Sequence, residues 1–333
     1  MQLSDIFLDP SARLRSGWRA IIFGIAFIIA TSILSIVLVA ILSLAYGSEN
    51  SLPILNGNWG FAIQGFILLF SAVTVGYACQ RVFEGLPVKA LGWALHPHWL
   101  RDWLAGSLLG ALTLIFATIV ATMFSGFTFA VSEQQLFPAV GKTLALSCFI
   151  FIFAAAAEEA LFRGYPLQTF TRANLMWLGI AITSIFFAMA HQGNPNQDAT
   201  RVVKIMAFTN TALAGIWLAV VYLKTRSLWL PLGVHWAWNW MMAAVLGLPV
   251  SGITKLTPNP LFRATDLGPA WLTGGPYGIE GGVACSIALV LSTLFVWRSK
   301  LFSATAEMKA LTSSETPRRA SASKADDYPL ITR

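Results

Sequence analysis

Long apolar runs separated by short polar connections dominate the chain. An apolar run of about 18 or more residues with few charges is long enough to cross a bilayer as a helix. The pattern predicts an all-α, polytopic integral membrane protein of about eight transmembrane helices, the fifth being the shortest. The predicted helices cover residues 17–45, 60–79, 103–124, 142–162, 176–191, 205–223, 228–248 and 279–297.

Polar ends frame this single membrane domain, which is expected at residues 17–300. Residues 1–16 are polar and are expected to lie along the membrane interface. From residue 301 the chain is small and polar with few core-forming groups, which predicts a disordered cytoplasmic tail at 301–333. The connection at 248–278 is rich in proline and glycine and predicts an irregular external loop.

Composition and charge support a membrane protein. Hydrophobic residues make up 56% of the 333 residues and charged residues 11%, against roughly 25% charged in soluble domains. With both termini in the cytoplasm, the positive-inside rule accounts for the net charge of +7, so no nucleic-acid partner is needed. Membrane lipids are the expected surroundings, and the short connections favour a bacterial inner membrane. Basic residues expected outside are Lys142, Arg201, Lys204, Lys255 and Arg263.

The cysteines and two of the histidines have ordinary explanations. Cys79, Cys148 and Cys285 lie in or beside apolar segments without metal-ligand spacing, so they are interpreted as small buried hydrophobes. His96 and His98 fall in a tryptophan-rich connection and are expected in a loop at the level of the lipid headgroups.

Two adjacent carboxylates interrupt the apolar segment FIFAAAAEEALFRGYPLQ at 151–168. A charge inside a membrane helix costs roughly 2.5–3.5 kcal/mol on insertion scales and usually faces the protein interior. Glu159 and Arg163 are four residues apart and can pair on one helical face. Glu158 lies about 100° around the helix from Glu159 and is left for another partner. A structural ion pair with a second glutamate at a wet helix end is the alternative.

Two further apolar segments carry polar residues. His191 ends the fifth predicted helix, four residues after Phe187, and the segment LWLPLGVHWAWNW places His235 and Asn239 at positions i and i+4. Each group alone also fits a hydrogen bond that supports helix packing. Together with Glu158, they could activate water and stabilise an oxyanion. Alternatively, zinc could bind in an open three-ligand site formed by Glu158, His191 and His235.

The order E-E-x-x-x-R, F-x-x-x-H and H-x-x-x-N resembles the CAAX protease and bacteriocin-processing enzyme family, which includes the type II CAAX prenyl endopeptidases. The resemblance covers about residues 140–245, with every motif position matched. It implies an eight-helix intramembrane endopeptidase with its catalytic groups on predicted helices four, five and seven, acting on a membrane-associated peptide or protein. The oligomeric state stays open.

The resemblance also implies residue roles. Glu158 would activate water with the help of His191, and His235 with Asn239 would stabilise the oxyanion. The family has been described both as metalloproteases and as metal-free, glutamate-dependent enzymes. The absence of H-E-x-x-H favours no tightly bound metal over zinc. The supporting residues would be Glu159, Arg163 and Phe187.

Two other functions remain open, and one geometric requirement follows. The chain could be a non-catalytic immunity or binding protein that keeps the fold, or a proton-coupled transporter, although no inverted repeat supports the latter. At ~1.5 Å per residue, straight helices at 142–162 and 176–191 would hold Glu158 and His191 far apart. We therefore expect helix four to extend to about residue 170, or helix five to be short or tilted.

Overall fold

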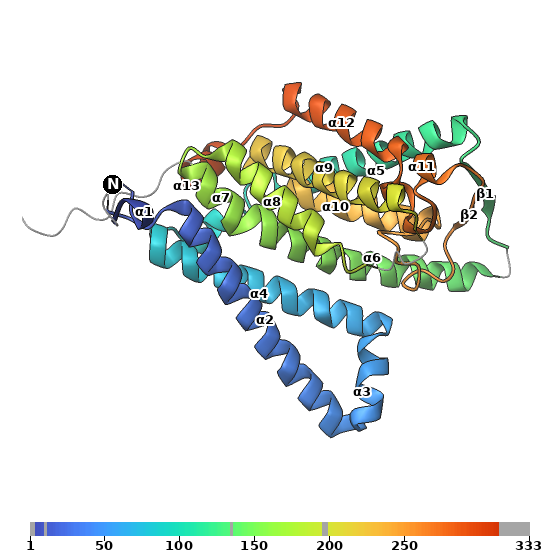
Figure 1. Ribbon diagram of the computed structural model, residues 1–333, viewed down its shortest axis with the longest axis horizontal. Coiled ribbons are helices and arrows are strands. Elements are labelled where there is room, and N and C mark those ends of the chain that lie inside the picture. The colour runs from blue at the N-terminus through green and yellow to red at the C-terminus, as the bar shows by residue number, and fades with distance from the viewer. Residues whose placement is uncertain (1–3, 10–11, 134–135, 195–198, 313–333) are drawn as a thin grey trace, which may run out of the picture.

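The computed structural model describes residues 4–9, 12–133, 136–194 and 199–312, which form the helical assembly of Figure 1. Helices α6, α8, α9 and α10 run side by side in its centre, and α5 and α12 lie along one side. The first half contains α1 (Ser4–Phe7), α2 (Ser16–Tyr46), α3 (Ser48–Leu55), α4 (Asn58–Glu84), the 3₁₀ helix η1 (Val88–Leu91), α5 (Trp99–Met123), β1 (Phe127–Val131) and α6 (Phe137–Glu159). The second contains the π-helix η3 (Ala160–Gly164), α7 (Tyr165–Arg172), α8 (Met176–Ala190), α9 (Arg201–Thr225), α10 (Trp229–Trp240), the π-helix η4 (Met241–Val245), β2 (Phe262–Asp266), α11 (Ala270–Thr273), the 3₁₀ helices η5 (Gly275–Tyr277) and η6 (Ile279–Gly281), α12 (Val283–Arg298) and α13 (Ala306–Thr312).

Helices occupy all eight predicted segments, and within the described part of the chain five are long and apolar enough to cross a membrane. These are α2, α4, α5, the continuous stretch Phe137–Arg172 and α9. Helices α8 and α12 are apolar but have 15 and 16 residues, and α10 with η4 covers residues 229–245. Length and composition therefore indicate a polytopic membrane protein with five clear spans.

The fourth predicted helix extends beyond residue 162, as the geometric requirement demanded. Helices α6, η3 and α7 run without a break from Phe137 to Arg172, which places Glu158 well inside the helix. The π-helical turn ends two residues before Pro166. Proline has no N–H for the carbonyl four residues earlier, and a widened turn accommodates that missing bond.

Backbone contact between α5 and α10 fixes the position of the helix that carries His235. A Cβ added to Gly106 or to Gly110 would lie 2.1 or 2.2 Å from a carbonyl oxygen of α10, and one on Gly233 would lie 2.1 Å from the Trp103 oxygen. Small residues four apart allow such close approach of membrane helices. Any larger side chain at these positions would push α10 away from α5.

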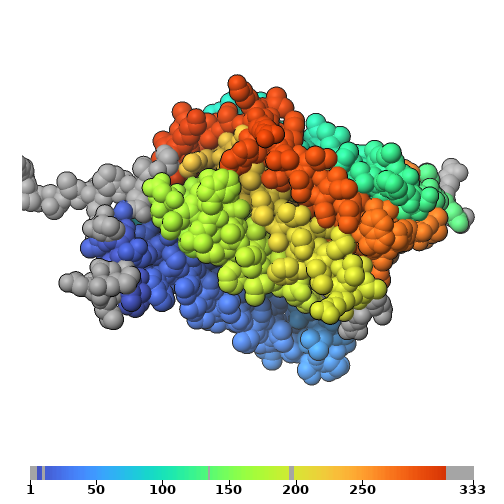
Figure 2. Space-filling model, turned by 45° about the horizontal axis from the view of Figure 1, so that its top comes forward, coloured from blue at the N-terminus to red at the C-terminus, as the bar shows by residue number. Residues whose placement is uncertain are grey.

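Helix α2 joins the bundle at its beginning only. Its buried residues are Ser16, Arg19, Phe23 and Phe27, and its remaining length diverges with α3 into the triangular projection of Figure 1. The Arg19 guanidinium lies 3.1 Å from a Glu84 oxygen, and the second oxygen is in direct contact with Arg172. This ion cluster ties α2, α4 and α7 together. Figure 2 shows the surface of α8 and α9 between the N-terminal helices and α12.

Two predictions need correction. The connection at 248–278 is not wholly irregular: β2 pairs with β1 in an antiparallel ladder, with Phe127 opposite Asp266. In the tail expected to be disordered, residues 306–312 form α13 because Met308 and Thr312 are buried against the bundle; residues 313–333 lie outside the described residues. His96 lies in a loop, as predicted, but it is buried, and its Nε2 lies 3.1 Å from the Ser227 hydroxyl oxygen. His98 is exposed.

Candidate active site

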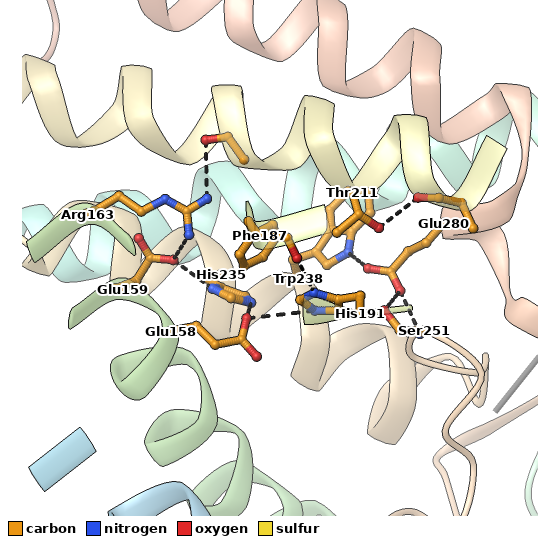
Figure 3. A network of polar contacts seen from close by, with 12 residues as sticks. Glu158, Glu159, Arg163, Phe187, His191, Thr211, His235, Trp238, Ser251 and Glu280 are labelled. Carbon is orange, nitrogen blue, oxygen red and sulfur yellow. Dashed lines mark hydrogen bonds and ion pairs between the residues drawn. The ribbon is translucent and has the colours of Figure 1, made fainter. Parts of the chain in front are cut away.

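The helices bring the polar residues singled out from the sequence into one place (Figure 3). Glu158 and Glu159 end α6, directly before the π-helical turn. His191 caps the C-terminal end of the short helix α8, and His235 and Asn239 lie on α10. Extension of the fourth predicted helix and the shortness of α8 together remove the separation that straight helices would impose.

The buried Glu159, together with its partners Arg163 and His235, forms the closed half of the site. Its Oε1 accepts hydrogen bonds from Arg163 Nη1 at 3.2 Å and from His235 Nδ1 at 2.8 Å, and its side chain is fully buried. Arg163 Nη2 also donates to the Gly215 carbonyl at 3.2 Å. Buried charges need such partners, so this glutamate is committed to holding the arginine and the histidine.

Phe187 covers the closed half from α8. Its ring centroid lies 4.5 Å from the Arg163 guanidinium carbon, a distance suited to a cation–π interaction. The same ring lies 4.7 Å from that of His191 and 6.0 Å from that of His235. Phe187 therefore packs against both histidines and the arginine at once.

Glu158, which lines a cavity, forms the open half of the site. Its side chain is 32% exposed, and its Oε2 lies 3.5 Å from His235 Nε2 and 3.9 Å from His191 Nε2. Neither separation is a direct hydrogen bond. Among the described residues this oxygen has no hydrogen-bond partner. This oxygen is itself buried, so it is an acceptor that lacks a donor beside the two imidazoles.

Hydrogen bonds orient both imidazoles with Nε2 toward Glu158. His191 Nδ1 lies 2.8 Å from the Phe187 carbonyl oxygen, which can only accept, so Nδ1 carries the proton. His235 Nδ1 faces the Glu159 carboxylate in the same way. Each ring is therefore locked, with its other nitrogen directed at the same carboxylate.

These groups line a cavity of about 360 Å³. Glu158, His191, His235 and Asn239 all contribute to its wall, and most of the remaining lining is apolar. A cavity of this size, with a few polar groups in an apolar wall, is typical of a small ligand or substrate site. Phe187 and Phe162 form part of the apolar wall.

The arrangement does not meet the requirements of the zinc alternative. Among the described residues, no group of three or more His, Cys, Asp and Glu side chains is placed to hold a metal ion. This includes the candidate set of Glu158, His191 and His235. All three cysteines are free, with Cys79 and Cys285 buried and Cys148 partly buried.

Sequence reasoning missed a second carboxylate in the cavity wall. Glu280 of η6 lines the cavity and binds Trp238 and Ser251. A lone charge in the glycine-rich stretch WLTGGPYGIEGG was the available signal. The spacing of Gly106 and Gly110, a G-x-x-x-G pattern in an apolar helix, was likewise available for the contact that positions α10.

Comparisons with known proteins agree with the motif order. Residues 139–241 match the family model Rce1-like, described as type II CAAX prenyl endopeptidase Rce1-like. The chain is 35% identical over 101 residues to an uncharacterized 24.3 kDa protein of Escherichia coli. The aligned residues make up 30% of this chain and 41% of that protein. No solved structure matches the chain. Residues 139–241, which contain every motif position from Glu158 to Asn239, are therefore similar to that family and are referred to as the Rce1-like domain.

Proposed function

We propose that this protein is an intramembrane endopeptidase that uses Glu158 to activate water. The observation that carries the proposal is the contrast between two adjacent glutamates. Glu159 is fully buried and pairs with Arg163 and His235 through Oε1, whereas Glu158 lines the cavity and faces two imidazole Nε2 atoms without a direct hydrogen bond. The Rce1-like domain supports a hydrolase of this kind.

The first step is attack of water on the scissile carbonyl carbon. Glu158 accepts one proton of the water as the new carbon–oxygen bond forms. His191 accepts a hydrogen bond from the same water through Nε2, because its Nδ1–H is engaged with the Phe187 carbonyl. The carbonyl π electrons move to the oxygen, giving a tetrahedral oxyanion.

His235 and Asn239 then stabilise the oxyanion. Before the attack, Glu158, Glu159 and Arg163 together carry one net negative charge, so an imidazolium at His235 makes the resting cluster neutral. In that form Nδ1–H donates to Glu159 and Nε2–H faces the cavity. Asn239, one helical turn further along α10, supplies an amide N–H. Collapse of the intermediate breaks the carbon–nitrogen bond, and the proton on Glu158 passes to the leaving amine.

The proposed substrate is a membrane-associated peptide or protein, and the proposed orientation places both termini in the cytoplasm of a bacterial cell. The matched family description names prenyl endopeptidases, so a prenylated peptide belongs among the reporters. The family model matches residues 139–241 alone, so unmodified peptides belong among the reporters as well.

The test compares cleavage of a reporter peptide library, prenylated and unmodified, in liposomes. Wild type is expected to cleave, and Glu158→Gln and His191→Ala are expected to lose about 10²–10⁴-fold in rate. Glu49→Gln, which removes an exposed carboxylate on α3, is the matched control. Chelation is expected to leave the wild-type rate unchanged. Equal cleavage by Glu158→Gln would sink the catalytic assignment.

A non-catalytic binding protein is the alternative outcome of the same experiment. It predicts that the wild type cleaves no reporter but still binds a peptide in the cavity. Binding of fluorescent peptides, measured beside the cleavage assay, separates this outcome from a protein that fails to fold.

A further inference from the structure

Glu280 is a second carboxylate in the wall of the same cavity, outside the Rce1-like domain. It lies in η6 (Ile279–Gly281), next to the start of α12. Figure 3 places its side chain on the far side of His191 from Glu158, beside Trp238 and Ser251. The proposed mechanism gives Glu280 no role, although it faces the space in which a substrate would lie.

Three donors hold this carboxylate in place. Trp238 Nε1 donates to Oε1 at 3.0 Å, while the backbone N–H and the hydroxyl of Ser251 donate to Oε2 at 2.7 and 2.8 Å. Indole and amide nitrogens can only donate, so each oxygen acts as an acceptor, as an ionised carboxylate does. A carboxylate has about four lone-pair sites, and three donors leave at least one unused.

The backbone of Glu280 is fixed as well. Asn210 of α9 donates through Nδ2 to the carbonyls of Glu280 at 2.8 Å and of Gly282 at 2.9 Å. Its own Oδ1 accepts from the Ser286 hydroxyl at 2.6 Å, and Asn210 is almost completely buried. The position of the carboxylate is therefore built into the packing of η6 against α9.

The charge of the cavity wall is one-sided. Glu158 and Glu280 contribute carboxylates to the lining, and no lysine or arginine lines the cavity within the described residues. Arg163 and the proposed imidazolium of His235 both pair with Glu159, and neither pairs with Glu280. Glu280 itself forms no ion pair with a described residue. A carboxylate withdrawn from water is stabilised when an opposite charge approaches, so the wall is complementary to a cation.

We propose that Glu280 determines specificity by pairing with a lysine or arginine side chain of the substrate peptide. The scissile carbonyl then lies between Glu158 and the His235–Asn239 pair, and the basic side chain reaches the far wall. This inference rests on the proposed function. It names the substrate class as a peptide with a basic residue close to the cleaved bond.

The test uses the full-length protein in liposomes and peptides that differ at one residue. Lysine, norleucine or glutamate is placed in turn at each position flanking the scissile bond. At one position the lysine peptide is expected to have a kcat/KM about ten- to a hundredfold above that of the norleucine peptide, mainly through KM, as for a hydrogen bond to a charged group. Glu280→Gln is expected to abolish this preference by lowering the kcat/KM of the lysine peptide to that of the norleucine peptide.

Controls separate recognition from folding. Glu49→Gln is expected to keep the preference, and thermal unfolding reports on each variant. Glu280→Asp keeps the charge on a shorter side chain and is expected to shift the preference from lysine to the longer homolysine. This variant decides the question even where Glu280→Gln does not fold. A lysine preference that persists in Glu280→Gln, or a wild type that cleaves without preference, overturns the proposal.

A binding measurement distinguishes failure of this inference from failure of the proposed function. If the wild type cleaves nothing, the peptidase proposal fails, and the affinities of the lysine and norleucine peptides then decide the role of Glu280. Tighter binding of the lysine peptide to wild type but not to Glu280→Gln supports cation recognition. Equal affinities overturn it.

Discussion

Glu84 and Glu158 are both carboxylates within an apolar helical protein, yet their surroundings differ in one decisive respect. Glu84 is fully buried and contacts Arg19, Arg172 and the Thr169 hydroxyl. Glu158 is 32% exposed, faces two imidazoles beyond direct hydrogen-bond distance and lines a cavity. Two guanidinium groups neutralise the first permanently, whereas the second has no permanent cation.

The contrast distinguishes a carboxylate that stabilises the fold from one that is able to transfer a proton. A buried carboxylate saturated by arginines cannot accept a proton without leaving those cations unpaired. A carboxylate that faces imidazoles and a cavity can accept and return a proton at little cost. Glu159 resembles Glu84 in this respect, although it directly precedes the site's π-helical turn.

Substitution of Glu158 is expected to affect activity rather than stability. Glu158→Gln is expected to lower kcat by about 10²–10⁴-fold with little change in unfolding, because the side chain is partly exposed and lies beyond direct hydrogen-bond distance of both imidazoles. Peptide cleavage and thermal unfolding in detergent measure the two effects. A large loss of stability would mean that Glu158 is structural, like Glu84.

Substitution of Glu84 is expected to affect stability rather than activity. Glu84→Gln leaves Arg19 and Arg172 without their carboxylate and is expected to lower the free energy of unfolding by about 3–5 kcal/mol. Activity per folded molecule should stay near wild type. Denaturant titration in micelles measures the loss, with Glu49→Gln as the exposed-carboxylate control. A selective fall in kcat would place Glu84 in the catalytic machinery instead.

Substitution of Phe187 tests whether packing in the closed half of the site, around Glu159, contributes to the activity proposed for Glu158. Phe187→Leu removes the ring over Arg163 and is expected to cost about 1–2 kcal/mol of stability and to lower kcat more than it changes KM. Phe186→Leu, at a neighbouring position that is 58% exposed, is the matched control. Equal behaviour of the two variants would contradict a supporting role for Phe187.

The smallest expected effect concerns His96, which belongs neither to the ion cluster of Glu84 nor to the site around Glu158. Burial lowers the pKa of His96, although Glu307 opposes this shift. The folded protein thus binds a proton less readily than the unfolded chain, and stability is retained above about pH 6.5 and falls as the pH drops through the folded pKa. His96→Gln should flatten the decline in melting temperature between pH 7.5 and 5.5. The exposed-residue variant His98→Gln should not.

The positions of the helices and the choice of site residues followed from the sequence to a large extent. Apolar runs located a helix in each of the eight predicted segments, and the i, i+4 spacing of Glu159 and Arg163 correctly predicted their ion pair. The strand pair and the burial of His96 were missed, since both depend on partners more than 100 residues away in the chain.

The amino-acid sequence alone indicated most of the candidate site residues, because charges in apolar helices are too costly to be accidental. Local spacing also separated the two adjacent glutamates. Only the tertiary structure decided that His235 Nδ1 pairs with Glu159 while its Nε2 faces Glu158, and that Glu280 lines the same cavity. These contacts join residues on different helices, and helix spacing and direction depend on packing such as the approach of α10 to Gly106 and Gly110.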